Sequence, residues 1–403
     1  MQLSCIANAA PCSMRLRLYL ALSTAFASED RWGDIASGKE VRQEAWSSYP
    51  AVKDYIASLQ RRKSGGAYGN WRAKDHKYPP VIQEVMCRYF YGKTYEEYQR
   101  MRPRTKHIPT LSVGGGWAWL EMGLVMEGLT SAMTVSDFSP GSIDIGRKSA
   151  PEETRGKMKF VVSNSNTDII EGKYAFIFCH HSLHHIDNLE FFLEQVHGAL
   201  LEGGIFAFAD FVGPTRYQWT PQQQYIQKLV IQALPEQLRR NGLEALQQAQ
   251  AGSHVHPHAI QRMHAHTHTE MISQDPSESV RSAEIMPVLE KWFATKLPVI
   301  EQVPLGGTIL HPMLDVIGFS WNQSDDKQVA LMKMMCVVDE LAIDLLGQSD
   351  FTLVVTQKDG DENLDMTQPS RRPPTNARQA HQTVLRGGPQ RFSSPYAKNL
   401  TLP

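Results

Sequence analysis

Two groups of residues in this chain combine side-chain types with a spacing that could support chemistry. The first begins with three consecutive glycines, Gly114, Gly115 and Gly116, and ends with the acidic Asp137 about twenty residues later. Glycines let the backbone approach a ligand closely, and a carboxylate accepts hydrogen bonds from ribose hydroxyls. This layout is typical of a segment that holds a nucleoside.

The second group is a run of histidines. His180, His181, His184 and His185 lie close together in the stretch HHSLHH. A neutral imidazole accepts a proton near pH 7, so His181 and His184 are candidates for orienting or deprotonating an acceptor molecule. His185 is as well explained as a packed residue at the entry of the following helix.

Hydrophobic patterning predicts the elements that position both groups. Apolar, β-capable runs alternate with helix-like segments, which favours a parallel sheet flanked by helices. Strands are expected at Ile108–Val113, Ala132–Val135, Phe160–Val162, Tyr174–Cys179, Ile205–Asp210, Val299–Pro304 and Phe351–Gln357. Helices are expected at Trp119–Leu129, from about Asn188 to Leu201 with a glycine stop at Gly203–Gly204, and at Pro221–Ala233, Pro235–Gln250 and Asp325–Leu346.

The order of these motifs resembles that of the class I S-adenosylmethionine-dependent methyltransferases. The matching pieces are VGGG, VSDFSP, FVVSNSN, the stretch from Tyr174 to Pro214 that contains HHSLHHIDN and LLEGG, and the downstream QDPSESVRS and PLGGTIL. The resemblance covers roughly Trp46 to Lys358. It implies an α/β fold with a Rossmann-like, doubly wound, mostly parallel seven-stranded sheet, an antiparallel last strand, a helical lid and a helical insertion.

The resemblance also implies S-adenosylmethionine as the cofactor and an oxygen or nitrogen of a small molecule as the methyl acceptor. In this assignment Asp137 binds the ribose, Phe138 packs on the adenine, Asn164 meets the adenine amine, and Cys179 and His180 flank the sulfonium. The implied cofactor-binding residues are Ser112, Gly114, Gly115, Gly116, Asp137, Phe138, Asn164, Ser165, Cys179 and His180. The implied catalytic residues are His181 and His184, with Asp210, Tyr217 and Trp219 next at the exit of the fifth strand.

Four positions differ from the usual pattern of that family. Ser112 stands where many members carry an acid, Ala118 replaces a frequent glycine, and Asn164 and Ala175 replace aspartates. Two alternatives therefore stay open. One is a non-methylating S-adenosylmethionine-dependent enzyme, and the other is a cofactor-binding protein with weak or no turnover.

Composition narrows the classes of partner and compartment. The formal net charge is −1 over 403 residues, which gives no basic field for a nucleic acid or a membrane surface. The five cysteines are odd in number and form no CxxC pair, which indicates reduced thiols and a cytoplasmic protein. Met14–Ala27 has signal-like features, but its apolar run is short and interrupted, so a leader or an amphipathic helix is favoured.

The chain is divided into six expected segments. Residues 1–40 form a variable leader, 41–108 an aromatic-rich helical lid, and 109–213 the Rossmann-like cofactor-binding core. Residues 214–283 form a helical insertion, 284–357 the remainder of the core, and 358–403 a disordered tail.

The insertion contains six histidines between His254 and His268. Imidazole is a common metal ligand, but these residues recur at spacings of two, which only a strand would place on one face. Gly252 and Pro257 argue against such a strand. We therefore expect a polar loop and no metal site.

Overall fold

The computed structural model describes residue 55 and residues 80–233, 269, 272, 275–314 and 326–359. Several predicted features lie outside the described residues. They are the leader with Met14–Ala27, most of residues 41–79, the helix Pro235–Gln250, the histidines between His254 and His268, and nearly all of the tail.

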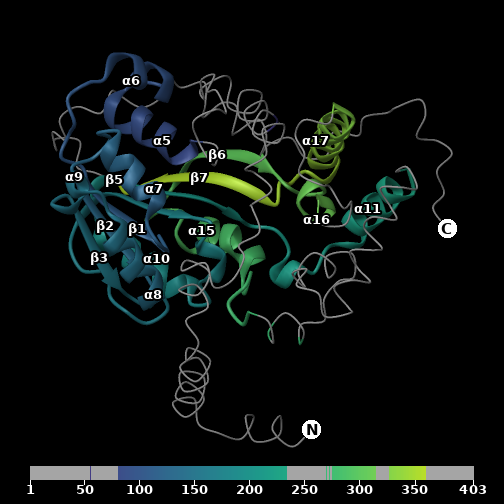
Figure 1. Cartoon of the computed structure of the whole chain (residues 1–403). Coiled ribbons are helices and arrows are strands. Elements are labelled where there is room, and N and C mark those ends of the chain that lie inside the picture. Colours follow the sequence, from purple (N-terminus) through teal and green to yellow (C-terminus); the bar gives the residue numbers. More distant parts are fainter. Residues whose placement is uncertain are drawn as a thin grey trace, which may run out of the picture.

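A seven-stranded sheet forms the centre of the described part of the chain (Figure 1). Its strands are β1 (Pro109–Val113), β2 (Ala132–Asp137), β3 (Met158–Val162), β4 (Tyr174–His180), β5 (Leu200–Phe211), β6 (Val299–Gly306) and β7 (Phe351–Gln357). Their order across the sheet is β3-β2-β1-β4-β5-β7-β6. The first five strands in this order are parallel, and β7 pairs antiparallel with both β5 and β6. The predicted fold class is confirmed.

Helices cover both faces of this sheet, so its central strands are apolar throughout. In β4, Phe176 and Phe178 belong to one buried cluster, while Ile177 and Cys179 belong to the other. The first cluster includes side chains of α7 (Trp119–Met126), α8 (Pro140–Ser149) and α17 (Asp326–Leu346). The second includes side chains of α10 (Leu189–Ala199) and α15 (Ile285–Trp292). Shorter elements are α9 (Glu152–Arg155), η4 (Leu183–His185), η5 (Thr215–Tyr217), η6 (Ser282–Glu284) and α16 (Leu310–Leu314).

The strand order reverses between β1 and β4. Chain connections leave the sheet in opposite directions at such a point, which opens a crevice at the carboxyl ends of these strands. The glycine turn follows β1 and the histidine run follows β4, so the fold brings the two sequence motifs to the same edge.

Two predicted helix ends are wrong. The helix expected to reach Leu129 ends at Met126. The helix expected to reach about Leu201 ends at Ala199, and Gly203–Gly204, expected as its stop, lie inside β5. The physical reason is strand pairing, because Leu200 already pairs with Tyr174 of β4. The register shifts before the next pair, and Gly203 occupies this irregular part of the strand with a φ of 71°.

The described part of the expected lid is α5 (Val81–Met86), the π-helical η3 (Cys87–Tyr91) and α6 (Tyr95–Met101). The Tyr98 hydroxyl donates to the carbonyl of Gly128, and the Tyr91 hydroxyl donates to that of Leu129. These carbonyls precede β2, so the segment packs at the amino-terminal edge of the sheet. A lid over the opposite edge stays a prediction for the residues before Pro80.

The insertion begins with α11 (Pro221–Ala233), which has the bounds predicted from its capping residues. The Thr220 hydroxyl accepts from the Gln223 N–H, and the Gln223 side chain accepts from the Thr220 N–H. Among the described residues, no helix has the length and apolar composition needed to cross a bilayer.

Candidate active site

The glycine turn after β1 contains two kinds of glycine. A Cβ on Gly114 would lie 2.3 Å from the Cβ of Ser182, and one on Gly115 would lie 2.6 Å from Val135. These two glycines are required by close packing. Gly116 differs, because no heavy atom lies within 4 Å of its Cβ position, and its φ is 57°. Its side of the turn faces open space.

Asp137 ties this turn to the end of β2. Its Oδ2 accepts from the Gly116 N–H at 2.8 Å, and its Oδ1 accepts from the Ser139 N–H at 2.8 Å. Beside it, the Phe138 side chain is 50% exposed, and so is Val162 at the end of β3. Two exposed apolar side chains therefore stand next to an ordered carboxylate at the carboxyl edge.

Ser112 acquires an acidic partner from the next helix. Its hydroxyl donates to Glu121 Oε1 at 2.5 Å, and Glu121 lies in the first turn of α7. Burial raises the pKa of Glu121 to about 7, and the charge of Asp137 adds to the shift, although the Ser112 hydrogen bond opposes it. Ser112 thus contacts an acid that lies nine residues further along the chain.

Ala118 and Asn164, two other departures from the pattern, have clear structural places. Ala118 is buried and precedes α7 with a φ of 64°, a conformation that glycine adopts more easily. The Asn164 side-chain oxygen accepts from the Asn166 N–H at 3.0 Å. Asn164 and Ser165 thus lie in a turn after β3, and Asn166 links this turn to the start of α10 by accepting from the Asp187 and Asn188 N–H groups.

The end of β4 separates its candidate residues. Cys179 is buried in the apolar cluster beneath α10, and burial raises the pKa of its thiol. His180 and His181 are partly exposed, and their rings meet edge to face at 4.6 Å. His181 has a φ of 55°, and its ring lies 5.8 Å from that of Phe351 in β7.

His184 is held in a different direction, toward the end of β5. Its Nδ1 lies 2.5 Å from Asp210 Oδ1. Asp210 is fully buried and also accepts from the backbone N–H groups of Ser182, Leu183 and Phe211. The Ser182 hydroxyl donates to the Val113 carbonyl at 2.6 Å, so the turn that carries His184 is joined directly to the glycine turn.

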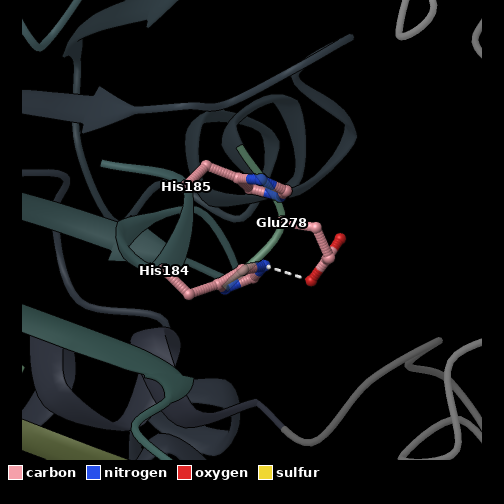
Figure 2. Close-up of side chains that lie close together, drawn as sticks. All are labelled: His184, His185 and Glu278. Atoms are coloured by element: carbon pink, nitrogen blue, oxygen red, sulfur yellow. Dashed lines mark ion pairs between the residues drawn. The ribbon is translucent and has the colours of Figure 1, made fainter. Parts of the chain in front are cut away.

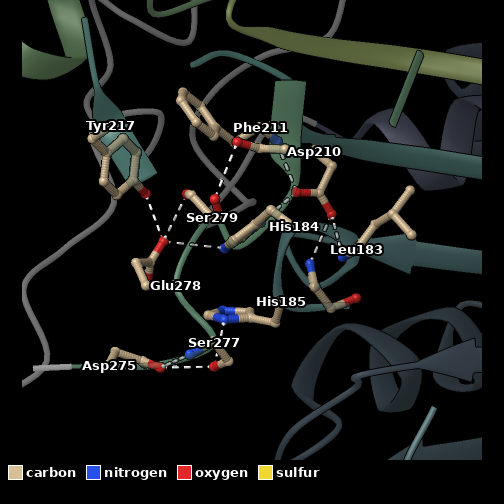
Figure 3. Close-up of polar contacts among 12 residues, drawn as sticks. Leu183, His184, His185, Asp210, Phe211, Tyr217, Asp275, Ser277, Glu278 and Ser279 are labelled. Carbon is tan, nitrogen blue, oxygen red and sulfur yellow. Dashed lines mark hydrogen bonds and ion pairs between the residues drawn. The ribbon is translucent and has the colours of Figure 1, made fainter. Parts of the chain in front are cut away.

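A downstream segment completes the surroundings of His184. Glu278 Oε1 lies 3.5 Å from His184 Nε2 and accepts from the Tyr217 hydroxyl at 2.7 Å and from the Ser279 hydroxyl at 3.2 Å. Figure 3 shows these side chains converging from η4, from the end of β5 and from residues 275–279. The Arg216 guanidinium donates to the carbonyls of Asp275, Pro276 and Glu278 and so fixes the path of this segment.

Two carboxylates determine the charge of His184. Burial would lower its pKa, but Asp210 opposes this by charge and by a hydrogen bond, and with help from Glu278 the pKa rises to about 9. The neighbouring His185 has a lowered pKa because it is buried and faces His184. At neutral pH His184 is therefore a cation between two carboxylates, while His185 is neutral.

Residues 111–208 match the model of a protein family described as a methyltransferase domain. The match runs from β1 into β5 and includes the glycine turn, Asp137 and the histidine run. Residues 111–208 of the chain therefore carry a methyltransferase domain.

Three solved structures with low sequence identity have some similarity to this chain. An S-adenosylmethionine-dependent methyltransferase from Mesorhizobium loti is 17% identical over 32% of this chain and 56% of its own, with a TM-score of 0.26. The O-MT part of StiE is 10% identical over 76% of this chain and 78% of its own, with a TM-score of 0.36. A Haloferax volcanii methyltransferase was solved in complex with the Trm112 activator. It is 12% identical over 70% of this chain and 95% of its own, with a TM-score of 0.36.

These likenesses support no argument about the acceptor. This chain spans only about half of the length of the Mesorhizobium loti chain. No curated protein matches the sequence.

Sequence reasoning missed two acids at this edge of the sheet. Glu121 was visible in the LSVGGGWAWLE stretch, and an acid in the first helical turn after a glycine turn was the available signal. Glu278 lies in QDPSESVRS, which resembled the family, but nothing in its local sequence indicates that the chain returns to His184.

Proposed function

We propose that this protein transfers a methyl group from S-adenosylmethionine to an oxygen of a small-molecule acceptor. One observation carries the proposal: the buried His184–Asp210 pair faces Glu278 immediately beside the glycine turn. A cofactor site and a group that handles protons therefore adjoin each other at one edge of the sheet.

The residues at this edge fit the cofactor. The open side of Gly116 leaves room for the ligand, and the Asp137 carboxylate stands where ribose hydroxyls would donate to it. The exposed Phe138 and Val162 offer apolar surfaces for the adenine. When bound, S-adenosylmethionine supplies a methyl group activated by a positively charged sulfur.

The remaining cofactor assignments are proposals of the same kind. Ser112, Gly114 and Gly115 shape the turn, with Ser112 held by Glu121. Asn164 and Ser165 lie beyond Val162 on the adenine side. Cys179 and His180 end β4 beside the proposed methionine part of the site.

An oxygen acceptor needs a group that takes its proton during attack. At neutral pH His184 is charged and cannot accept that proton, so the Glu278 carboxylate is the group that receives it. His184 Nε2, 3.5 Å away, then stabilises the developing charge or shares the proton, while Asp210 holds the ring in one orientation. Tyr217 fixes the Glu278 carboxylate. His181 stays a second candidate, on the side of Phe351.

The test is methyl transfer from radiolabelled S-adenosylmethionine to separate panels of phenols, carboxylic acids and amines. We expect turnover on an oxygen panel, and we expect His184→Ala and Glu278→Gln to lower it by about 10²–10⁴-fold. Binding of S-adenosylhomocysteine, measured by calorimetry, should change little. His197→Ala on α10 is the matched control.

Several outcomes would overturn parts of this proposal. Full turnover by both variants would mean that neither His184 nor Glu278 takes the acceptor's proton, and His181→Ala would be the next variant to test. Transfer to amines alone would replace oxygen by nitrogen as the acceptor. Cofactor binding with no transfer to any panel would favour a non-catalytic binding protein.

We also propose a cytoplasmic location. The described cysteines Cys87, Cys179 and Cys336 are buried and form no disulfide, as in proteins of reducing compartments. Detection of the labelled full chain in separated cell fractions would test this location.

A further inference from the structure

Two adjacent imidazoles and one carboxylate meet above the end of β4. His184, His185 and Glu278 each offer a ligand atom, and these atoms lie within 4.8 Å of one another. The two rings are 4.2 Å apart at 40°, and Figure 2 shows both extending toward the Glu278 side chain. Metal-bound ligand atoms are separated by about 3–3.5 Å when each is about 2.1 Å from the ion, so a small closure would suffice.

The hydrogen bonds of His184 select the nitrogen that faces this space. Asp210 is an acceptor for its Nδ1, so this nitrogen carries a proton and Nε2 points to Glu278. A carboxylate behind a histidine is the usual device that orients a metal-binding imidazole and makes it more basic.

The hydrogen bonds of His185 lead to the same tautomer. The Ser277 hydroxyl donates its only proton to Asp275 Oδ1 at 2.7 Å, so toward His185 Nδ1, at 3.1 Å, it can only accept. His185 Nδ1 therefore carries the proton, and the lone pair of this imidazole is on Nε2. Hydrogen bonds thus occupy the Nδ1 atoms of both rings, so Nε2 is the nitrogen of each ring that can bind a metal ion. At His184 the ion would displace the proton on Nε2.

The donor set and its charge indicate the class of ion. Two imidazole nitrogens and one carboxylate suit zinc and related transition metals better than calcium or magnesium, which prefer oxygen ligands. Asp210 and Asp275 add negative charge behind the two histidines. Three protein ligands leave a fourth position for water or another ligand.

We propose that His184 Nε2, His185 Nε2 and the Glu278 carboxylate bind one divalent transition-metal ion of the zinc class, and that a bound ion inhibits methyl transfer. The binding half stands on these contacts alone. The inhibitory half rests on the proposed function, because His184 and Glu278 cannot both hold a metal ion and handle the acceptor's proton. This differs from the expectation of no metal site drawn from the sequence.

The experiment must separate this site from the six histidines between His254 and His268. The full chain with those six changed to asparagine serves as the background protein. After removal of metals, zinc binding is measured by calorimetry, and Co²⁺ is added to record the visible absorption of a nitrogen- and oxygen-ligated ion. We expect one ion per chain, and we expect His185→Ala or Glu278→Gln in this background to weaken binding at least about tenfold. His197→Ala is the control that should leave binding unchanged.

Each result bears on one half of the proposal. Absence of Co²⁺ bands, or equal zinc affinity in all variants, would overturn the metal site whatever the turnover data show. Zinc inhibition is measured on the background protein against its metal-free turnover, and a bound ion without inhibition would overturn the inhibitory half. If no acceptor is methylated, the proposed function fails, and calorimetry and absorption still decide whether the site binds metal.

Discussion

Individual buried acids determine much of the chemistry at the carboxyl edge of the sheet. Glu121 and Asp210 are both almost fully buried, but their partners differ. Glu121 meets one hydroxyl and has a raised pKa, whereas Asp210 meets three N–H groups and a charged imidazole. Burial raises the pKa of Asp210, but these partners lower it more strongly, and the pKa is about 2. The charge and hydrogen bond of His184, added to the N–H donors, thus let Asp210 keep its charge despite its burial.

Glu121→Gln should change how stability depends on pH. The folded-state pKa of Glu121, about 7, lies above its ordinary value of 4.5, so the folded protein binds the proton more tightly than the unfolded chain. Its contribution to stability is therefore greatest below pH 4.5 and falls as the pH rises to 7, by about 3 kcal/mol. Glutamine keeps the Ser112 contact without that loss. Urea unfolding at pH 5 and pH 8 should show a smaller decrease for Glu121→Gln than for wild type. The exposed Glu153→Gln should follow wild type.

Asp210→Asn should destabilise the protein by about 3 kcal/mol. Each Asp210 oxygen accepts hydrogen bonds from two donors. Whichever way the asparagine amide is turned, its NH₂ group would therefore face two donors and could not accept from them. Urea unfolding near pH 7 measures the loss. The exposed Asp144→Asn on α8 should change stability by less than about 1 kcal/mol, and an equal effect of both substitutions would contradict the role given to Asp210.

At the scale of elements, the glycine turn and the turn after β4 form one interlocked unit. Ser182 bonds to the end of β1 and fills the space beside Gly114. The glycine turn therefore has this shape only when β1 and β4 are paired.

Gly114→Ala and Gly116→Ala should separate packing from ligand binding. Both glycines have a positive φ, which costs alanine about 1–2 kcal/mol. Only at Gly114 does the new Cβ collide with Ser182, so this variant should lose about 3 kcal/mol or more of unfolding free energy. Gly116→Ala should lose about 1 kcal/mol but bind S-adenosylhomocysteine more weakly. Urea unfolding and calorimetry on both proteins check this, and unchanged affinity in Gly116→Ala would place the ligand elsewhere.

Local signals predicted most elements well, and long-range pairing explains the errors. Thr220 and Gln223 bond to each other within one turn, so the sequence predicted where α11 begins. Gly203 was predicted as a helix stop. Its actual place in β5 depends on pairing with β4, which is distant in the sequence and gives no local signal. At the site, the motif residues near Gly116 and His184 were predictable, but the meeting of His184 with Glu278 depends on how the chain returns after the insertion.

At the scale of the whole molecule, Tyr55 connects the start of the chain to its end. Its hydroxyl donates to Asp339 of α17, 284 residues away, and the same carboxylate accepts from the N–H groups of Gly307, Ile309 and Leu310. Tyr55 is therefore attached to α17, the last helix of the described residues.

Tyr55→Phe should lower the unfolding free energy by about 1 kcal/mol, because a buried hydrogen bond is lost while Asp339 keeps its three N–H donors. Tyr174→Phe makes the same chemical change in a hydroxyl that bonds only to Glu171 nearby and should cost less. Urea unfolding of both variants tests this. Equal losses would mean that the long-range connection adds no stability.

β7 is the last strand to be synthesised, yet it lies between β5 and β6. About 140 residues separate the end of β5 from the start of β7, which a ribosome takes roughly 7–30 seconds to add. During this interval the nascent chain carries an apolar strand with one unpaired edge, the kind of edge that recruits other strands. We expect chains released before Phe351 to aggregate, and productive synthesis to benefit from a chaperone that covers β5 until its partner emerges.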